Sequence, residues 1–224
     1  MKRIIKMAAT LAVAGGVALG AVVGPELWAG YQFLTVVDQQ TAEYEANGGE
    51  WPQLQDTCAL CHGQNGQSGN SLYPSLAGLS ASYIQNQLHA YANGRRHSPQ
   101  MQPLARSLSD DQIEMLAAYF ERQAPVIVES HEANGSLDER GQDIVNNSGC
   151  TSCHGDQLNG TPNGPRLAGQ GEIYLADQLT AFKRGTRKDP TQAMNGMAAA
   201  LSEEDIQATA RYLSSLAPTS RNTQ

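Results

Sequence analysis

Apolar residues recur at helical spacing in this chain, and the segments that contain them form two matching sets. One stripe predicts a helix that ends near Gly94, and an equivalent stripe predicts a helix that ends near Gly185. The stripes consist of Ile84, Leu88 and Tyr91, and of Leu175, Leu179 and Phe182. No segment alternates between apolar and polar residues as a half-buried strand would. The pattern predicts an all-α fold.

Three more helices are indicated by residues that cap helix N-termini. Ser109 and Ser202 each precede an apolar face, so each is expected to be the N-cap of a helix. Ser136, with Glu139 three positions later, predicts a capping box that opens another helix. The two apolar faces consist of Ile113, Leu116, Ala117 and Phe120, and of Ile206, Ala210 and Leu213.

The matching helices belong to an internal repeat. Residues 74–78 (Pro-Ser-Leu-Ala-Gly) match residues 165–169 (Pro-Arg-Leu-Ala-Gly) at an offset of 91, and residues 108–113 match residues 201–206 at an offset of 93. Loop insertions produce a drift of this size. The economical interpretation is two copies of one domain, residues 41–124 and 136–224. The linker at 125–135 contains an apolar run, residues 126–128, which is expected to pack across the domain interface.

Residues 1–40 have the features of an export signal. Lys2, Arg3 and Lys6 precede an uncharged apolar run from Met7 to Val23. That run approaches the lower limit of about 17 residues for a membrane-spanning helix, and Trp28 suits a membrane interface. The segment is therefore either a cleaved signal peptide or a retained membrane anchor, with a slight preference for the anchor. Both alternatives place the rest of the chain in the periplasm.

Each copy contains two cysteines followed at once by histidine, at residues 58–62 and 150–154. This Cys-x-x-Cys-His spacing is the signature of c-type haem attachment. Two thiols reach the vinyl groups of one porphyrin, and the adjoining imidazole ligates the iron. A four-thiolate zinc site or two disulfides would also use four cysteines, but neither explains the histidines. The sequence predicts two covalent haem c groups, on Cys58 and Cys61 and on Cys150 and Cys153.

The axial iron ligands are expected to be one histidine and one methionine in each copy. His62 and His154 supply the imidazoles, and thioether sulfur is a suitable second ligand. At the offset of 93, Met101 pairs with Met194, whereas Met197 pairs with Leu104, which is interpreted as an apolar packing position. Met101 and Met194 are therefore the predicted ligands, with Met197 as the alternative in the second copy.

His97 is the alternative ligand in the first copy. It lies four residues before Met101 and would give the first haem two histidine ligands.

A further set of residues is expected to surround the haems. Pro74 and Pro165 could accept hydrogen bonds from the ligand imidazoles through their carbonyls. Tyr83 and Tyr174 could reach haem propionates, and so could two arginines, for which simple surface charge is an equal alternative. The arginines are Arg96 and Arg187, which pair at an offset of 91.

The balance of charge argues against nucleic acid as a partner. Beyond residue 40 the chain has 20 acidic and 12 basic side chains, a formal charge of −8. Binding to the phosphate backbone depends on an excess of lysine and arginine.

Taken together, the motifs resemble the dihaem cytochrome c4 family over about residues 54–216. The resemblance rests on both haem motifs, the Pro-x-Leu-Ala-Gly segments, the Tyr-x-x-x-Gln-Leu helices and residues 194–202. It implies two tandem class I cytochrome c domains related by pseudo-twofold symmetry, with propionate edges facing across the interface. It also implies electron delivery to a terminal oxidase. The donor could be a quinol-oxidising complex or a small copper protein.

Three classes of function remain distinct. An electron carrier is favoured, because two protein ligands on each iron leave no position open to a substrate. A dihaem oxidoreductase, such as a peroxidase or a sulfur-compound dehydrogenase, would need one labile methionine ligand. A tethered subunit of a respiratory complex would use the same chemistry but would stay attached to membrane partners through residues 1–40.

Overall fold

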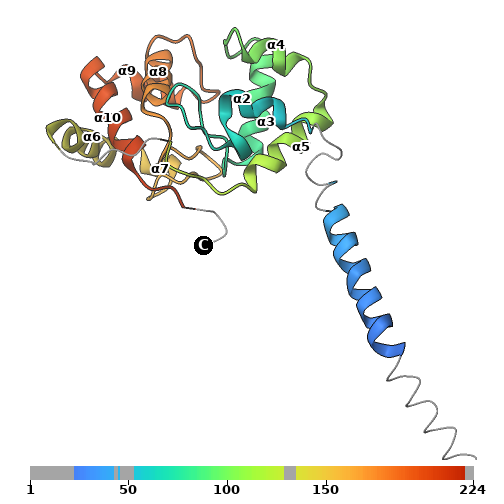
Figure 1. The fold of residues 1–224 in the computed structure, drawn as a ribbon. Helices are drawn as coiled ribbons and strands as arrows, with labels where there is room; N and C mark the ends of the chain where they lie inside the picture. Colours follow the sequence, from blue (N-terminus) through green and yellow to red (C-terminus); the bar gives the residue numbers. More distant parts are fainter. Residues whose placement is uncertain (1–22, 43–44, 46–52, 129–134, 220–224) are drawn as a thin grey trace, which may run out of the picture. The chain divides into compact units, whose positions relative to one another are not determined.

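The computed structural model describes residues 23–42, 45, 53–128 and 135–219. The chain divides into two compact units, residues 1–50 and 51–224. In the first unit, residues 23–42 form one helix (Figure 1). Its exposed apolar side chains include Leu27, Trp28 and Tyr31. Among the residues described, no helix combines the length and apolar character needed to cross a membrane. Residues 1–22 lie outside the described part, so the choice between signal peptide and anchor stays a prediction.

The regular secondary structure of the second unit is helical in its described residues, which confirms the predicted all-α class. The only strand-like pairing recorded there is one isolated bridge between Thr161 and Gly164. The helices of the first copy are α2 (Asp56–His62), η1 (Gln64–Gly66), α3 (Ala81–Ala92), α4 (Met101–Arg106) and α5 (Asp110–Glu121). Those of the second copy are α6 (Ser136–Asn147), α7 (Thr151–His154), α8 (Glu172–Lys183), α9 (Ala193–Ala199) and α10 (Glu203–Ser215).

The two copies repeat one arrangement of helices, drawn from cyan to yellow-green and from olive to red in Figure 1. In the first copy α3 packs against α4 and α5, and in the second α8 packs against α9 and α10. Helix α6 adds a further layer on α10. At the repeat offset, the counterpart of α6 falls at about residues 44–55, most of which lie outside the described part.

Each copy has its own apolar core, built from the predicted stripes. The first core contains Ile84, Leu116 and Phe120, and the second contains Leu175 and Ile206. The residues packed around them include Leu88, Leu179 and Met115. Small separate cores of this kind bury limited apolar surface, which leaves room for a large apolar cofactor to complete each domain.

The predicted N-caps of the last helix in each copy are confirmed. The Ser109 hydroxyl accepts from the Gln112 backbone N–H, and the Gln112 side chain accepts from the Ser109 N–H. Ser202 and Asp205 form the same reciprocal pair at α10. Each pair is a capping box, which satisfies two N–H groups that the helix cannot pair itself.

The capping box predicted at Ser136 is wrong. Helix α6 does begin at Ser136, but this puts Ser136 inside the first turn and makes Gly135 the N-cap. Glu139 donates its backbone N–H to the Gly135 carbonyl, and no side chain caps this end. The helix was therefore located correctly, and its cap was displaced by one residue.

The interpretation of Leu104 and Met197 as apolar packing positions is also wrong. Leu104 is 55% exposed and Met197 is 36% exposed. Both residues lie in short helices, α4 and α9. The repeat offset of 93 shows that the two residues are equivalent, but it does not show that their positions are buried.

The start of the linker runs from the first copy onto the second. Gln67 donates its side-chain amide to the Ala124 carbonyl at 2.9 Å, and Val128 donates its backbone N–H to the Gly169 carbonyl at 3.1 Å. The expected interdomain contact is thus made by the backbone of Val128. The side chains of Val126 and Ile127 remain exposed, which differs from the packing expected for them.

Candidate haem sites

Both Cys-x-x-Cys-His motifs lie in short helices that bring the three side chains together. In α2, Cys58 and Cys61 are three residues apart, which places them on one helix face, and His62 ends the helix. Helix α7 places Cys153 and His154 in the same way, directly after Cys150. The histidines are buried, whereas Cys61 and Cys153 are exposed.

The alternative uses of the cysteines do not fit this geometry. None of the four cysteines, each of which is described, forms a disulfide with another. Among the described residues, no three His, Cys, Asp or Glu side chains form a cluster able to hold a metal ion, so the two pairs do not meet in a four-thiolate zinc site. Each pair is instead placed beside one buried histidine.

The predicted hydrogen bonds from the histidines to proline carbonyls are confirmed in both copies. The His62 Nδ1 lies 2.8 Å from the Pro74 carbonyl oxygen, and the His154 Nδ1 lies 2.7 Å from that of Pro165. A carbonyl can only accept, so Nδ1 carries the proton and Nε2 is free to bind a metal.

Burial favours the neutral form of both imidazoles. It lowers the pKa of His62, and the nearby Arg96 guanidinium lowers that pKa further, against the opposing effect of the Pro74 hydrogen bond. Burial likewise lowers the pKa of His154 against the effect of its bond to Pro165. Neutral imidazole is the form that ligates iron.

A cavity of about 960 Å³ adjoins the second motif. Cys153, His154 and Met194 all line it, so the structure brings the predicted cysteine, histidine and methionine of this copy around one space. Its volume lies at the upper end of the usual range of about 300–1,000 Å³ for ligand pockets, which suits a porphyrin. The residues present therefore fit a haem.

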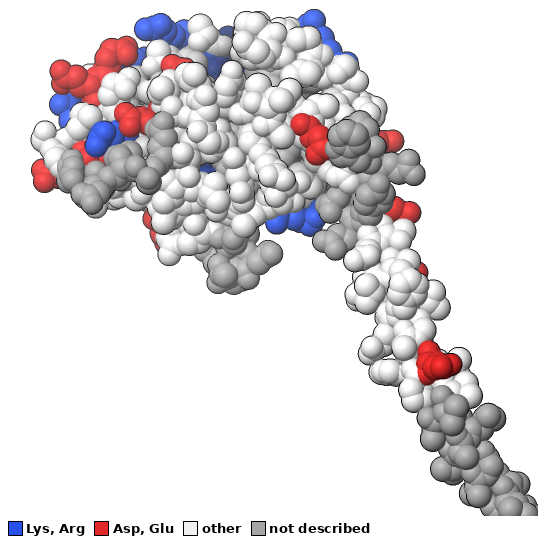
Figure 2. Space-filling model, viewed as in Figure 1, with Lys and Arg blue, Asp and Glu red and all other residues white. Residues whose placement is uncertain are grey.

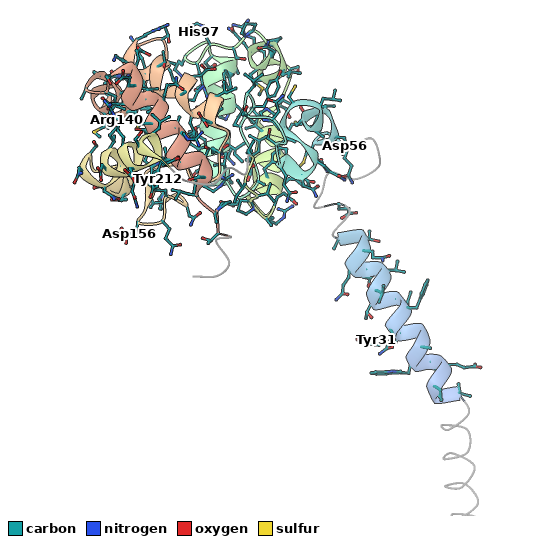
Figure 3. All side chains as sticks on the ribbon, turned by 60° about the vertical axis from the view of Figure 1, so that its left-hand side comes forward. Tyr31, Asp56, His97, Arg140, Asp156 and Tyr212 are labelled. Carbon is teal, nitrogen blue, oxygen red and sulfur yellow. The ribbon has the colours of Figure 1, made fainter. Side chains whose placement is uncertain are left out.

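Met101 occupies the equivalent position in the first copy. It is half-buried at the start of α4, as Met194 is near the start of α9. His97 is exposed and lies at the edge of the unit in Figure 3. It also contributes to the lining of the cavity beside His154, on the side formed by the first copy.

The two methionine loops are held by different side chains. In the second copy, Asn195 donates to the Phe182 and Arg187 carbonyls at 2.8 and 2.9 Å and accepts from the Asp189 N–H at 3.0 Å. In the first copy, the Ser98 hydroxyl accepts from the Met101 N–H at 3.1 Å. Sequence reasoning did not find Asn195, although a short amide beside a candidate ligand was a usable signal.

Arg96 crosses the interface between the copies. It donates to Gln87 of its own copy at 2.7 Å, and to the Tyr174 hydroxyl and Gln178 of the second copy at 3.2 and 2.8 Å. Its guanidinium carbon also lies 4.7 Å from the centre of the Tyr91 ring. With 8% exposure, Arg96 is a buried interdomain residue, and the alternative of simple surface charge is wrong.

Arg187 makes the same contacts in the opposite direction. It donates to Gln178 at 2.7 Å, and to the Tyr83 hydroxyl and Gln87 of the first copy at 3.1 Å each. Its guanidinium stacks over the Phe182 ring at 4.5 Å, and it is 9% exposed. The reciprocal pattern is what a twofold relation between the copies produces. The glutamines were visible in the repeated Tyr-x-x-x-Gln-Leu segments, but no role was predicted for them.

This arginine network is strongly positive. Burial raises the pKa of the Tyr174 hydroxyl, but the charges of Arg96 and Arg187 outweigh burial and lower it overall. The two guanidinium groups donate hydrogen bonds to hydroxyl and amide oxygens, which carry no charge. A pair of buried cations with neutral partners favours anionic groups of a cofactor nearby.

Comparison with known proteins assigns the family. Two protein-family models match, "Cytochrome c" over residues 139–217 and "Cytochrome C oxidase, cbb3-type, subunit III" over residues 52–120. A cytochrome c4 from Pseudomonas aeruginosa is 36% identical over 170 residues, which cover 71% of this chain and 83% of that protein. The chain belongs to the dihaem cytochrome c4 family. The cytochrome c4 assignment establishes two covalent haem c groups on the two cysteine pairs, and a role in electron transfer.

Two further relatives of this cytochrome c4 chain are informative. The crystal structure of reduced recombinant cytochrome c4 from Pseudomonas stutzeri superposes with a TM-score of 0.66 at 32% identity, covering 72% of this chain and 94% of that chain. A protein from Stutzerimonas stutzeri named "Thiosulfate dehydrogenase electron acceptor" is 38% identical over 169 residues, which cover 71% of this chain and 78% of that protein.

Proposed function

We propose that this protein carries electrons in a periplasmic respiratory chain through two six-coordinate haems. His62 and Met101 are the proposed axial ligands of the first iron, and His154 and Met194 those of the second. The observation that carries the proposal is the pair of buried histidines, each oriented by a proline carbonyl beside two cysteines. A haem bound at each site stores one electron as its iron changes between the ferric and ferrous states.

The proposed ligands close both irons to substrates. Catalysis by haem needs an open or labile coordination position, or an unusual ligand such as cysteine thiolate. All four cysteines are used for attachment, and Asn195 fixes the loop of Met194 with three hydrogen bonds. These features support a carrier over the rival peroxidase or sulfur-compound dehydrogenase. Sustained oxidation of peroxide or thiosulfate by the pure protein would reverse this preference.

The interdomain arginines support haems whose propionates face each other. Arg96 and Arg187 are buried between the copies, and each would retain N–H groups for a propionate oxygen beside its present partners. Tyr83 and Tyr174 orient these guanidinium groups through their hydroxyls. Inner propionates at this position would bring the edges of the two haems close together, as a short path for electrons requires.

A redox titration followed through the near-infrared Met–Fe(III) charge-transfer band tests the ligand assignment. Two methionine-ligated centres should each contribute to the band. Met101→Ala and Met194→Ala should each remove about half of it and leave covalent haem content unchanged. If the wild type shows half the expected band and His97→Ala changes its spectrum, His97 is the ligand in place of Met101. A band that survives in Met194→Ala but is lost in Met197→Ala would assign Met197.

The proposed partners are redox proteins on either side of this carrier. The acceptor is proposed to be a terminal oxidase, and the donor a quinol-oxidising complex or a small copper protein. A third candidate donor is a thiosulfate dehydrogenase, because the relative from Stutzerimonas stutzeri is named as the electron acceptor of such an enzyme. Stopped-flow reduction by each donor decides between them: the physiological donor should reduce the protein far faster than the others at equal concentration.

The proposed location is the periplasm, and attachment to the membrane through residues 1–40 is the point to be tested. Fractionation of cells that express the full chain, followed by sequencing of the mature N-terminus, separates the alternatives. A membrane-bound protein that retains its first residues supports the anchor. A protein released with the periplasmic fraction and starting beyond residue 20 supports a cleaved signal peptide.

A further inference from the structure

A second polar cluster joins the two copies, and the haem-binding role proposed above does not use it. Arg166 lies at its centre with only 2% exposure. Its guanidinium donates to the Ala168 carbonyl at 2.5 Å within its own copy. It also donates to the Ala77 and Ser75 carbonyls of the first copy, at 3.1 and 3.5 Å. One buried cation therefore holds backbone from both copies.

Gln170 reinforces the same contact. Its side-chain amide donates to the Ser75 carbonyl at 2.8 Å, and its amide oxygen accepts from the Ser75 N–H at 2.9 Å. Ser75 is fully buried, and its hydroxyl donates to the Gly66 carbonyl at 3.1 Å. The backbone of Ser75 is thus fixed on both its N–H and its carbonyl by side chains of the second copy.

The position of this cluster relative to the histidines gives it a consequence for the haems. Ser75 directly follows Pro74, whose carbonyl accepts from His62, and Arg166 directly follows Pro165, whose carbonyl accepts from His154. A continuous series of peptide and hydrogen bonds therefore links one candidate iron ligand to the other. Ser75 and Arg166 are also equivalent residues of the repeat, so the twofold relation brings them together, and the single arginine serves both sides.

We propose that Arg166 is a positioning residue that couples the two haem centres through their histidine ligands. The inference rests on the proposed ligation by His62 and His154. Acceptors that orient a ligating imidazole influence the metal it binds, so fixing both proline segments fixes both imidazoles. The buried positive charge acts on both irons as well, because it disfavours the ferric state more than the ferrous state in a medium of low dielectric.

Three variants of the full-length holoprotein separate the effects of charge and geometry. Arg166→Gln removes the charge and most of the donors, Arg166→Lys keeps the charge but loses the planar fork, and Gln170→Met breaks the tie to Ser75 without altering charge. Arg140→Gln is the matched control, because Arg140 (Figure 3) is an exposed arginine of the same copy. It pairs with Glu204 and Asp205.

The readouts are the two midpoint potentials and the rate of electron exchange between the haems in half-reduced protein, measured by NMR exchange spectroscopy. Arg166→Gln should slow exchange about tenfold. It should also shift both reduction equilibria about tenfold toward the ferric state, which corresponds to about 59 mV for a one-electron couple. Arg166→Lys and Gln170→Met should slow exchange while the potentials stay near wild type. Arg140→Gln should change neither quantity.

Unchanged exchange rates in both Arg166→Lys and Gln170→Met would overturn the coupling role, even if Arg166→Gln fails to accumulate. Covalent haem content and the Met–Fe(III) band of each variant report on the proposed ligation separately. If the wild-type protein lacks that band, the ligand assignment has failed. If the band is intact and exchange is insensitive to these substitutions, the ligand assignment holds and the role of Arg166 is wrong.

Discussion

The two copies hold their histidines alike and their methionine loops differently. The bonds from His62 to Pro74 and from His154 to Pro165 differ by 0.1 Å, at 2.8 and 2.7 Å. By contrast, Asn195 makes hydrogen bonds to three backbone groups around Met194. In the first copy, the Ser98 hydroxyl accepts one hydrogen bond from the Met101 backbone N–H. Features that attach and orient the cofactor are thus repeated, whereas the features that hold the proposed methionine ligands differ between the copies.

In the second copy, the last helix is supported by an additional helix. Helix α10 carries α6 across it, and the ion pair between Arg211 and Asp138 joins the two at 3.2 Å. Figure 2 shows charged side chains gathered at this end of the unit, around α6 and α10. The described residues of the first copy contain no helix that packs on α5 in this way. Substitutions at the α6 crossing should therefore affect the second copy selectively.

Gly141→Ala should give the largest loss of stability. A Cβ at position 141 would lie 2.1 Å from the Ala208 carbonyl oxygen of α10, so the helices must separate. Overpacking of this kind costs about 1–3 kcal/mol, and backbone contact places this case at the upper end. Urea unfolding followed by circular dichroism measures the loss. Gln142→Ala, on an exposed position of the same helix, is the control and should be close to neutral.

Asn195→Ala should have the next largest effect, and it tests the difference between the methionine loops directly. Loss of a half-buried amide with three hydrogen bonds should cost about 2 kcal/mol and loosen the proposed ligand Met194. Part of the Met–Fe(III) band should then disappear at moderate temperature. Gln102→Ala is the matched substitution in the first copy, at the equivalent position, and should leave the band intact. Equal effects of the two substitutions would remove the distinction drawn between the loops.

The parts of this structure that could be predicted from the sequence are local or repeated. The stripes through Ile84 and Leu175, and the N-caps Ser109 and Ser202, depend on residues within one helix. The Pro74 contact was accessible because a ligating histidine needs an acceptor and the repeat offered one at nearly the same spacing twice. These inferences needed no knowledge of how the copies dock.

The parts that were missed depend on docking of the copies or on one residue of register. For Arg96, surface charge was as good an interpretation as contact with a haem propionate, because nothing near it in sequence shows that Tyr174 and Gln178 of the other copy will cover it. No role was predicted for Arg166, because its acceptors in the first copy are backbone carbonyls far from it in sequence. At Ser136 the capping pattern was correct in composition and shifted by one position, which local propensity does not resolve.

Tyr83→Phe and Tyr174→Phe test the symmetric part of the comparison. Each removes one hydroxyl that accepts from the arginine of the opposite copy, at 3.1 and 3.2 Å. Each should cost about 1 kcal/mol of unfolding free energy, and the two costs should agree because the contacts are reciprocal. Differential scanning calorimetry on both variants provides the measurement. A clear inequality would show that the interface is less symmetric in its energetics than in its contacts.

The smallest expected effect is a difference in pH dependence between the two capping boxes. Hydrogen bonds from Ser202, together with Arg140, lower the pKa of Asp205 from its ordinary value to about 2. A carboxylate whose pKa is lower in the folded state stabilises the protein above its unfolded pKa. That contribution is lost as pH falls from about 4 to about 2. Gln112, the residue at the equivalent position of the first copy, does not titrate.

Asp205→Asn should therefore cost at most about 1 kcal/mol at about pH 7 and almost nothing at about pH 2, because Asp205 is at the surface and screened by solvent. Gln112→Ala should cost the same at both pH values, since a neutral cap satisfies the helix N-terminus independently of protons. Urea unfolding of the two variants at a series of pH values measures how the cost in unfolding free energy changes with pH for each. If Asp205→Asn has the same cost throughout, the cap acts through hydrogen bonding alone and the charge of Asp205 contributes nothing to the second copy.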